Sequence, residues 1–149
     1  MSKKLISDFD ISNFLEEIYS LPQTVASETY IWSFQYRVLI YILYTNTKLF
    51  KIGLSLNDKC TFCDSSKEEL YHLFFECSHT EIFWKTFSCW CFELVKENIT
   101  MTSKDIMLGL LNRTDVINYL IILGKLCIWK CRKAGIHPDF DIFLKKSKN

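Results

Sequence analysis

Apolar residues recur along most of this chain at the three- and four-residue spacing of helices that bury one face or their whole surface. One such pattern covers Ile11 to Leu21 and stops before Pro22, and a longer one runs from about Glu28 to Tyr44. The polar residues 45–47 end the second pattern, and a brief segment from Leu49 to Gly53 follows. We therefore expect two helices and a short connection before the first cysteine.

Helix starts farther along the chain are marked by capping boxes, in which a hydroxyl accepts from first-turn amides and a carboxylate three residues later reaches back. Three pairs fit this pattern: Ser66 with Glu69, Ser78 with Glu81, and Thr102 with Asp105. They predict a helix that carries His72, a second helix through about Lys96, and a short third helix.

The longest late pattern runs from Thr114 to about Lys133, with Gly135 suited to its C-terminal cap and Pro138 to the first turn of a last helix. Only 4 Gly and 2 Pro occur in 149 residues, too few for the turns of a many-stranded sheet. No repeat or linker divides the chain. We therefore predict one all-α domain over residues 1–149, a small helical bundle with an inserted metal-binding loop at residues 60–77.

A group of soft ligands gives this loop its predicted chemistry. Cys60 and Cys63 lie on one turn, and His72 and Cys77 follow. Tetrahedral Zn²⁺ takes such a Cys3His set, and four protein ligands leave no open position for a catalytic water. We expect one structural zinc ion. Residues five apart on one α-helix face different directions, so a break is expected between His72 and Cys77, where the box at Ser78 begins a new helix.

Two alternatives concern the remaining histidines and cysteines. His79 could replace His72 as the nitrogen ligand, although it lies only two residues from Cys77. A second metal site could be formed by the other cysteines, which could equally be buried core residues: Cys89, Cys91, Cys127 and Cys131. Seven cysteines are an odd number and the N-terminus lacks an apolar signal core, so we expect a reduced intracellular compartment, cytoplasmic or nuclear.

The charged residues are unevenly distributed, although the formal net charge is only +1. Charged residues interrupt both of the most apolar stretches, Tyr30 to Tyr44 and Val116 to Cys131, so no membrane span is expected. Residues 64–97 contain seven acidic and three basic side chains, whereas residues 125–149 contain seven basic and two acidic ones. The C-terminal part is therefore a candidate basic face for nucleic acid.

One stripe of the helix predicted at 114–133 combines basic and aromatic side chains: Asn118, Ile122, Lys125, Trp129 and Arg132. Cations beside tryptophan are what single-strand binders use to contact phosphates and stack bases. The stripe is flanked or extended by further lysines: Lys130, Lys133, Lys145, Lys146 and Lys148. Alternatively, Trp129 packs in the core and the long basic side chains extend to water. Core packing is favoured for Trp129, and phosphate contact for the lysines.

A second basic candidate lies on the helix predicted at 28–44. Arg37 belongs to it, and Lys48 and Lys51 follow. Arg37 could instead pair with a carboxylate. The aromatic residues around the metal-binding loop are expected to pack as a small core: Phe74, Phe75, Phe83 and Trp84.

With these motifs, the chain resembles the zinc-binding C-terminal region of reverse transcriptases from non-LTR, LINE-type retrotransposons. The resemblance covers about residues 30–146. It is carried by residues 32–39 and 45–53, the cysteine motif with Glu69, residues 72–77, Trp84, residues 123–125 and 128–132, and Pro138. It implies Cys60, Cys63, His72 and Cys77 as zinc ligands, in agreement with their spacing. It also implies a region that follows the polymerase and helps it hold template RNA or target DNA.

The chain also departs from related proteins. Eight residues between Cys63 and His72 are too many for a retroviral nucleocapsid knuckle. The strings at 8–10 and 139–141, each Asp-Phe-Asp, lack the flanking strand pattern of polymerase aspartates, and no endonuclease-like set of His, Asp and Asn is present. We therefore expect this chain to have no polymerase or nuclease activity on its own and not to be an enzyme. It would be either a fragment of a larger element or a stand-alone remnant.

Two functional hypotheses follow. In the first, the chain is a non-enzymatic zinc module of retroelement origin that binds RNA or DNA weakly and with low specificity. In the second, it is a protein interaction module that docks on a polymerase core through apolar surface. A salt titration distinguishes the two hypotheses, because the affinity of phosphate contacts falls steeply with salt and that of an apolar interface does not.

Overall fold

The computed structural model describes residues 23–96, 101–108 and 115–147. The helix predicted at Ile11 to Leu21 lies outside these ranges. Within them the secondary structure is helical: α3 (Gln23–Leu39), α4 (Asn46–Lys51), the π-helix η1 (His72–Glu76), α5 (Ser78–Val95), α6 (Ser103–Leu108), α7 (Asp115–Ala134) and α8 (Phe140–Ser147). No strand occurs in the described ranges, where an isolated antiparallel bridge joins Lys59 and Lys67. The all-α prediction is confirmed.

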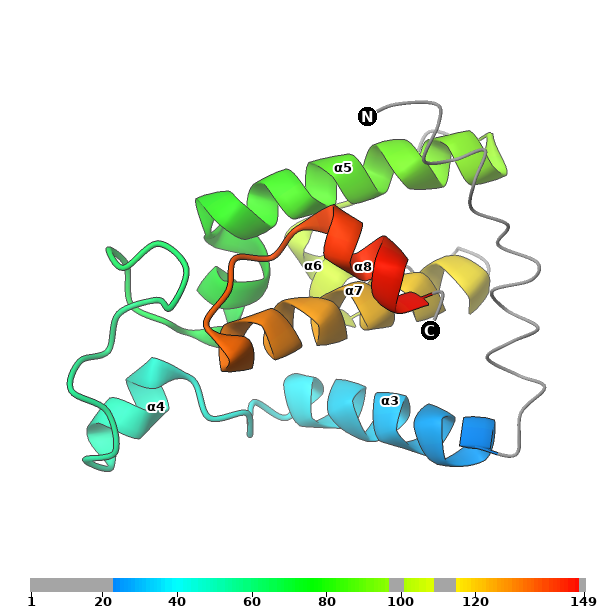
Figure 1. Ribbon diagram of the computed structural model, residues 1–149. Helices are drawn as coiled ribbons and strands as arrows, with labels where there is room; N and C mark the ends of the chain where they lie inside the picture. Colours follow the sequence, from blue (N-terminus) through cyan, green and yellow to red (C-terminus); the bar gives the residue numbers. More distant parts are fainter. Residues whose placement is uncertain (1–22, 97–100, 109–114, 148–149) are drawn as a thin grey trace.

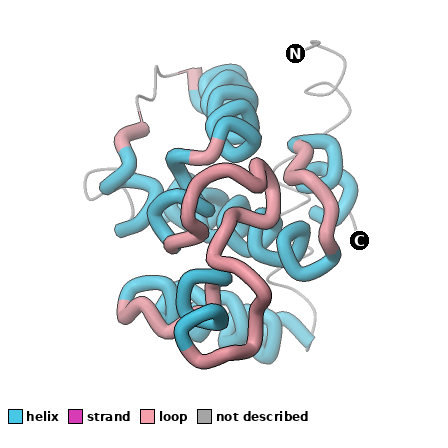
Figure 2. The backbone as a smooth tube through the Cα atoms, turned by 90° about the vertical axis from the view of Figure 1, so that its left-hand side faces the viewer, coloured by secondary structure: helices cyan, strands magenta, loops and turns pink. Residues whose placement is uncertain are grey.

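The helices lie in layers around α7. In Figure 1, α5 crosses one side of the molecule, α3 crosses the other, and α7 lies between them with α6 and α8. Figure 2, a view from the left of Figure 1, shows the long connection from α4 to η1 in front, between the layers. The predicted metal-binding loop therefore lies at one end of the bundle. No helix among the described residues is long and apolar enough to cross a membrane.

An aromatic core holds α5 against α8 and α7. Phe87 and Trp90 of α5 meet Phe143 and Phe140 of α8 with ring centroids 5.8 and 5.6 Å apart, respectively. On the α7 side, a Cβ at Gly124 would lie 2.9 Å from the Trp84 ring, which is closer than packed atoms tolerate. The absence of a side chain at Gly124 thus permits the close approach of α5 and α7.

The predicted helix at 28–44 ends earlier than the apolar pattern does. Tyr41 has a left-handed φ of 58°. The amide of Tyr41 donates to the carbonyl of Val38 and that of Ile42 to Arg37, both at 3.1 Å. These two bonds form a Schellman cap, so α3 stops at Leu39. The apolar residues beyond it belong to a turn, and the polar residues 45–47 begin α4 instead of ending α3.

Some of the helix caps predicted from the sequence are present in the structure and others are not. The amide of Thr102 donates to the Asp105 carboxylate at 2.8 Å and the amide of Asp105 returns to the Thr102 hydroxyl at 3.3 Å, as a capping box requires. Gly135 caps α7 with a φ of 71°. Pro138, however, lies before α8, where the Asp139 carboxylate accepts the amide of Asp141 at 3.0 Å. The last helix therefore begins later than predicted.

Candidate metal centre

The segment before His72 is not the helix that the Ser66 and Glu69 pair predicts. The amide of Cys60 donates to the carbonyl of Ser66 at 2.7 Å, and that of Asp64 to Cys60 at 2.9 Å. These bonds close a tight loop, joined at its base by the bridge between Lys59 and Lys67. Because loop closure uses the carbonyl of Ser66, the chain becomes helical only at Leu70. The loop brings both thiols of the first cysteine pair to its inner side.

The break predicted between His72 and Cys77 is present in an unexpected form. Residues 72–76 form a π-helix, and the amide of Cys77 donates to the carbonyl of His72 at 2.9 Å. A π-turn is wider than an α-turn, so residues five apart come closer to one face. Cys77 itself is extended, with φ −60° and ψ 136°, and is the N-cap of α5, so Ser78 is its first residue instead of its cap. The wide turn thus directs both side chains toward the loop.

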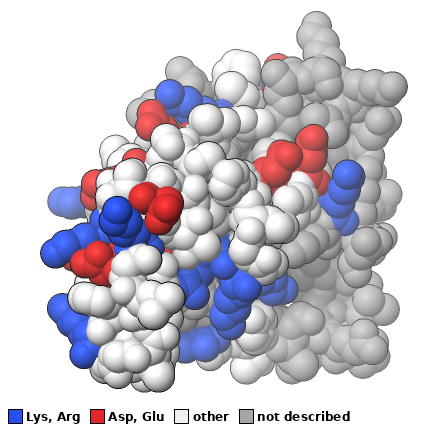
Figure 3. Space-filling view, turned by 60° about the vertical axis from the view of Figure 1, so that its left-hand side comes forward, with Lys and Arg blue, Asp and Glu red and all other residues white. Residues whose placement is uncertain are grey.

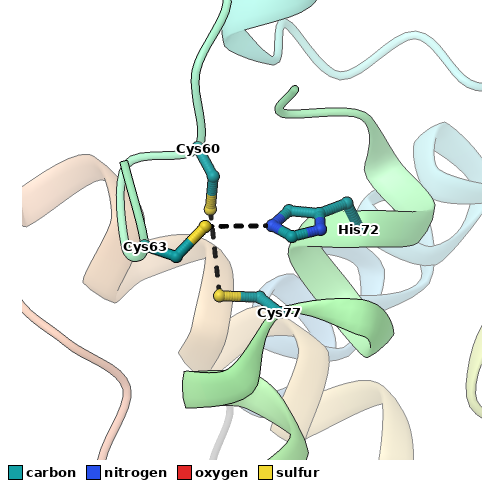
Figure 4. Close-up of side chains that lie close together, drawn as sticks. All are labelled: Cys60, Cys63, His72 and Cys77. Carbon is teal, nitrogen blue, oxygen red and sulfur yellow. Dashed lines mark hydrogen bonds between the residues drawn. The ribbon is translucent and has the colours of Figure 1, made fainter. Parts of the chain in front are cut away.

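The four predicted ligands come together in one cluster (Figure 4). All four ligand atoms of Cys60, Cys63, His72 and Cys77 lie within 4.8 Å of one another. The two sulfurs of Cys60 and Cys77 are 3.9 Å apart, and the Cys63 sulfur is 3.4 Å from Nε2 of His72. Tetrahedral zinc at its usual bond lengths needs about 3.8 Å between sulfurs and about 3.6 Å between sulfur and nitrogen. The cluster could therefore hold one zinc ion with little rearrangement.

The three thiols differ in how readily they ionise. Burial raises the pKa of the Cys60 thiol to about 12 and also raises that of Cys77. Burial acts in the same direction at Cys63, but hydrogen bonds from Ser65, Ser66 and His72 outweigh it and lower the pKa of Cys63 to about 5. Zinc needs thiolate ligands and releases the protons of those that are not yet ionised. Of the three thiols, Cys63 alone favours the thiolate before a metal binds.

A buried carboxylate that the sequence analysis did not single out ties this loop to the bundle. Glu68 is fully buried, and its Oε2 accepts from the amide and hydroxyl of Thr61 at 2.7 and 2.6 Å. Its Oε1 accepts from the amide of Asn46 at 2.8 Å and from Nε and Nη2 of Arg132 at 3.0 and 2.9 Å. Burial alone would raise the pKa of Glu68, but these donors and the Arg132 charge lower it. The one feature of the sequence that could have pointed to this role is an acidic residue between Cys63 and His72.

The predicted basic stripe on α7 is not a continuous exposed surface. Lys125 is fully buried, and its Nζ donates to Gln35 Oε1 of α3 at 2.5 Å and to the carbonyl of Met107 of α6 at 3.1 Å. Arg132 is committed to Glu68, with a side chain that is 12% exposed. Both cations join parts of the bundle, which corrects the expectation that they form one open face with Trp129.

The other members of the predicted basic faces have different surroundings. Trp129 is 5% exposed and packs near Phe74, in agreement with the core interpretation. Lys133 is exposed and its Nζ lies 5.7 Å from the centre of the Trp129 ring, whereas exposed Lys130 lies over Tyr30 at 5.8 Å. These two lysines lie exposed at the surface of α7.

On α3 and α4, Arg37 and Lys48 are half-buried. Nε of Arg37 is buried without a hydrogen-bond partner, and no ion pair of Arg37 is found among the described residues. Lys48 lies on α4, beside exposed Lys51. Both helices contact the C-terminal half of α7, α3 through Tyr30 beneath Lys130 and α4 through the bond from Arg132 to Asn46.

The alternative ligands lie outside the cluster. The ring of His79 lies against that of His137 with centroids 4.1 Å apart, and His72 is the histidine that belongs to the cluster. In the described part of the chain, Cys60, Cys63, His72 and Cys77 are the one group of three or more candidate metal ligands that lies close together. Of the other cysteines, Cys89 is exposed and three are buried: Cys91, Cys127 and Cys131.

Comparison with known proteins agrees with this geometry. Residues 18–84 match the family model described as zinc-binding in reverse transcriptase. The matched range contains all four clustered ligands and ends at Trp84, whose indole donates to the carbonyl of Phe74 at 2.6 Å. No curated protein and no solved structure matches the chain. Residues 18–84 are thus similar to a zinc-binding region associated with reverse transcriptases, and the Cys3His cluster is the place where this region could hold one zinc ion.

Proposed function

We propose that this chain is a non-enzymatic zinc-binding module derived from a LINE-type retrotransposon reverse transcriptase, and that it helps to hold RNA or DNA. One observation carries the proposal: the ligand atoms of four candidate zinc ligands lie within 4.8 Å of one another in a segment that matches the reverse-transcriptase zinc family. Such a protein acts in the cytoplasm or nucleus, where its nucleic-acid partners are.

The ligand set supports a structural metal. Three thiolates and one imidazole complete a tetrahedral zinc site and leave no position for a substrate or a nucleophilic water. Cys60 and Cys77 are buried, so solvent reaches the site mainly on the side of Cys63 and His72. The zinc ion would fix the loop without taking part in a reaction.

The cations available for phosphate are those that the fold leaves exposed. Lys130 and Lys133 lie near the C-terminal end of α7, and Lys145 lies on α8. The bond from Arg132 to Glu68 joins this end of α7 to the zinc loop. Zinc would therefore stabilise the helix end that presents the lysines, which makes nucleic-acid binding dependent on the metal.

The test is a salt series with the zinc-loaded full chain and fluorescent single-stranded RNA and DNA. We expect one zinc ion per chain and an affinity that falls with salt by about 0.7 logarithmic units per tenfold salt for each phosphate contact. A chelator should remove the binding. Absence of binding at low salt, or an affinity indifferent to salt, would contradict the nucleic-acid role. Absence of tightly bound zinc would contradict the module itself.

A further inference from the structure

The segment between α3 and the zinc loop exposes most of the large apolar side chains on the described surface. Ten of the fifteen that are exposed lie between residues 36 and 56: Tyr36, Leu39, Ile40, Tyr41, Ile42, Tyr44, Phe50, Ile52, Leu54 and Leu56. Leu54 is 73% exposed and Leu56 is 99% exposed. We name these ten residues the α3–α4 face. Exposed apolar side chains concentrated in one segment often mark a binding surface, whereas single ones scattered over a protein need no explanation.

The backbone fixes this face in place. The Schellman cap at Tyr41 ends α3, and a second cap at Gly53, with a φ of 78°, ends α4. The amide of Asn46, the first residue of α4, donates to buried Glu68 at 2.8 Å. The face is therefore attached to the Glu68 network and has defined geometry, as a docking surface requires.

The charges within the segment that carries the face have one sign. Residues 30–57 contain three cations, Arg37, Lys48 and Lys51, and no aspartate or glutamate. Figure 3 shows an area of uncharged atoms at its lower left, bordered mainly by Lys and Arg, with acidic atoms beside them at its upper edge. Because a complementary partner must carry the opposite sign at its rim, the face selects for carboxylates.

The composition of the face distinguishes between a protein and a nucleic acid. Six of its ten members are leucine or isoleucine, which offer no ring on which a base can stack. Aromatic and aliphatic residues at the centre, with cations at the rim, are typical of protein interfaces. We propose that the α3–α4 face docks a polypeptide partner that presents an apolar helical stripe flanked by aspartate or glutamate. This goes beyond the proposed nucleic-acid role, which uses the lysines of α7 and α8.

The probe is a synthetic amphipathic peptide with leucine at helical spacing and glutamate on its flanks, and the matched peptide has lysine in place of glutamate. Both are titrated against the zinc-loaded full chain by fluorescence anisotropy. We expect the glutamate peptide to bind about tenfold or more tightly than the lysine peptide. The double variant Leu54→Ser, Leu56→Ser should weaken the glutamate peptide about tenfold, and Lys48→Glu with Lys51→Glu should reverse the preference.

The control variant is Ile82→Ser with Phe92→Ser, which removes two exposed apolar side chains of α5 outside the face. It should bind the glutamate peptide like the parent, and circular dichroism and zinc content should be unchanged in all variants. Equal binding of both peptides, or of the parent and the Leu54, Leu56 variant, overturns the proposal. The proposal is also overturned if a single-stranded oligonucleotide displaces the peptide from the parent chain and binds the Leu54, Leu56 variant more weakly. A dimer of this chain that the same variant converts to monomer, without peptide binding, assigns the face to a second copy instead. The salt series with nucleic acid tests the earlier proposal separately.

Discussion

Two cations on one stripe of α7, Arg132 and Lys125, are buried in different surroundings. Arg132, at the C-terminal end, meets a buried carboxylate and the side chain of Asn46, with Nη2 at 2.9 Å from Glu68 and from Asn46. Lys125, two turns earlier, meets neutral oxygens of Gln35 and Met107. Its burial lowers the pKa of Lys125 to about 7. Spacing alone made these residues look alike.

The difference shows which part of the molecule depends on charge. At the zinc end, Arg132 neutralises Glu68, and Glu68 in turn holds Thr61 of the loop and Asn46 of α4. In the middle of the bundle, Lys125 bridges three helices but brings an uncompensated charge into the core when protonated. We therefore expect the zinc end to lose stability when its charges are removed, and the middle to lose stability when its charge is present.

The largest expected effect comes from the metal site itself. Cys77→Ser removes a buried ligand, and structural zinc in such motifs contributes about 10 to 16 kcal/mol at pH 7. We expect loss of the bound zinc and of amide protection in the loop at residues 58–77, measured by metal analysis and hydrogen exchange. Cys89→Ser, at an exposed cysteine outside the cluster, is the control and should keep both. A folded, protected loop in the zinc-free Cys77 variant would remove the structural role of the metal.

The next effect tests the charged end of α7. Arg132→Met leaves Glu68 buried without its counter-charge, and we expect a loss of about 3 to 5 kcal/mol in the free energy of unfolding, measured by urea denaturation with zinc present. Lys133→Met, at the next position and exposed, should cost little. Adding Glu68→Gln to Arg132→Met should recover part of the loss, because no uncompensated charge then remains. Equal losses in the single and double variants would indicate that packing, not charge, is responsible.

The middle of α7 should respond to pH in a defined direction. The ordinary lysine pKa is 10.5 and that of Lys125 is lowered to about 7, so between these values the unfolded chain binds the extra proton. The penalty of burying Lys125 is therefore complete below pH 7 and disappears as pH rises toward 10.5. We expect the stability of Lys125→Met relative to the parent to fall with pH, by on the order of 3 kcal/mol between about pH 7 and pH 10. A difference independent of pH would show that Lys125 keeps its ordinary pKa when folded, so that its charge is well compensated.

The smallest effect separates buried from exposed cations in nucleic-acid binding. Lys130→Ala with Lys133→Ala should weaken single-stranded RNA binding and reduce the salt slope by about one unit for each lost phosphate contact. Lys125→Met should leave both quantities near the parent values, because its ammonium does not reach solvent. If Lys125→Met weakened binding as much as the exposed pair, α7 would have to open when it binds nucleic acid.

Much of the metal centre could be predicted from sequence because its chemistry is local. The spacing of Cys60, Cys63, His72 and Cys77 identified the ligand set, and the same four residues cluster in the structure. The need for a break before Cys77 followed from helical geometry. Its form, a π-turn, could not be predicted, because this turn depends on the bond from the Cys77 amide to His72 and on the loop that packs against it.

Helix boundaries were predictable where a local bond decides them. Thr102 with Asp105 and Gly135 cap their helices through contacts within a few residues. Ser66 with Glu69 failed, because the carbonyl of Ser66 accepts the amide of Cys60 and the loop takes the segment that a helix would need. The apolar pattern to Tyr44 failed likewise, because α3 ends at its Schellman cap while hydrophobic residues continue past it.

The sequence by itself determined the helical class and the four candidate metal ligands, since periodicity, capping and ligand spacing act over a few residues. The tertiary structure alone decided the fate of the α7 cations, because neither Glu68 for Arg132 nor Gln35 for Lys125 is near its partner in the chain. It also decided that the apolar residues of the α3–α4 face are exposed, although their composition predicted burial. Long-range contacts determine which side chains become buried, and a hydrophobic pattern read along the chain does not contain them.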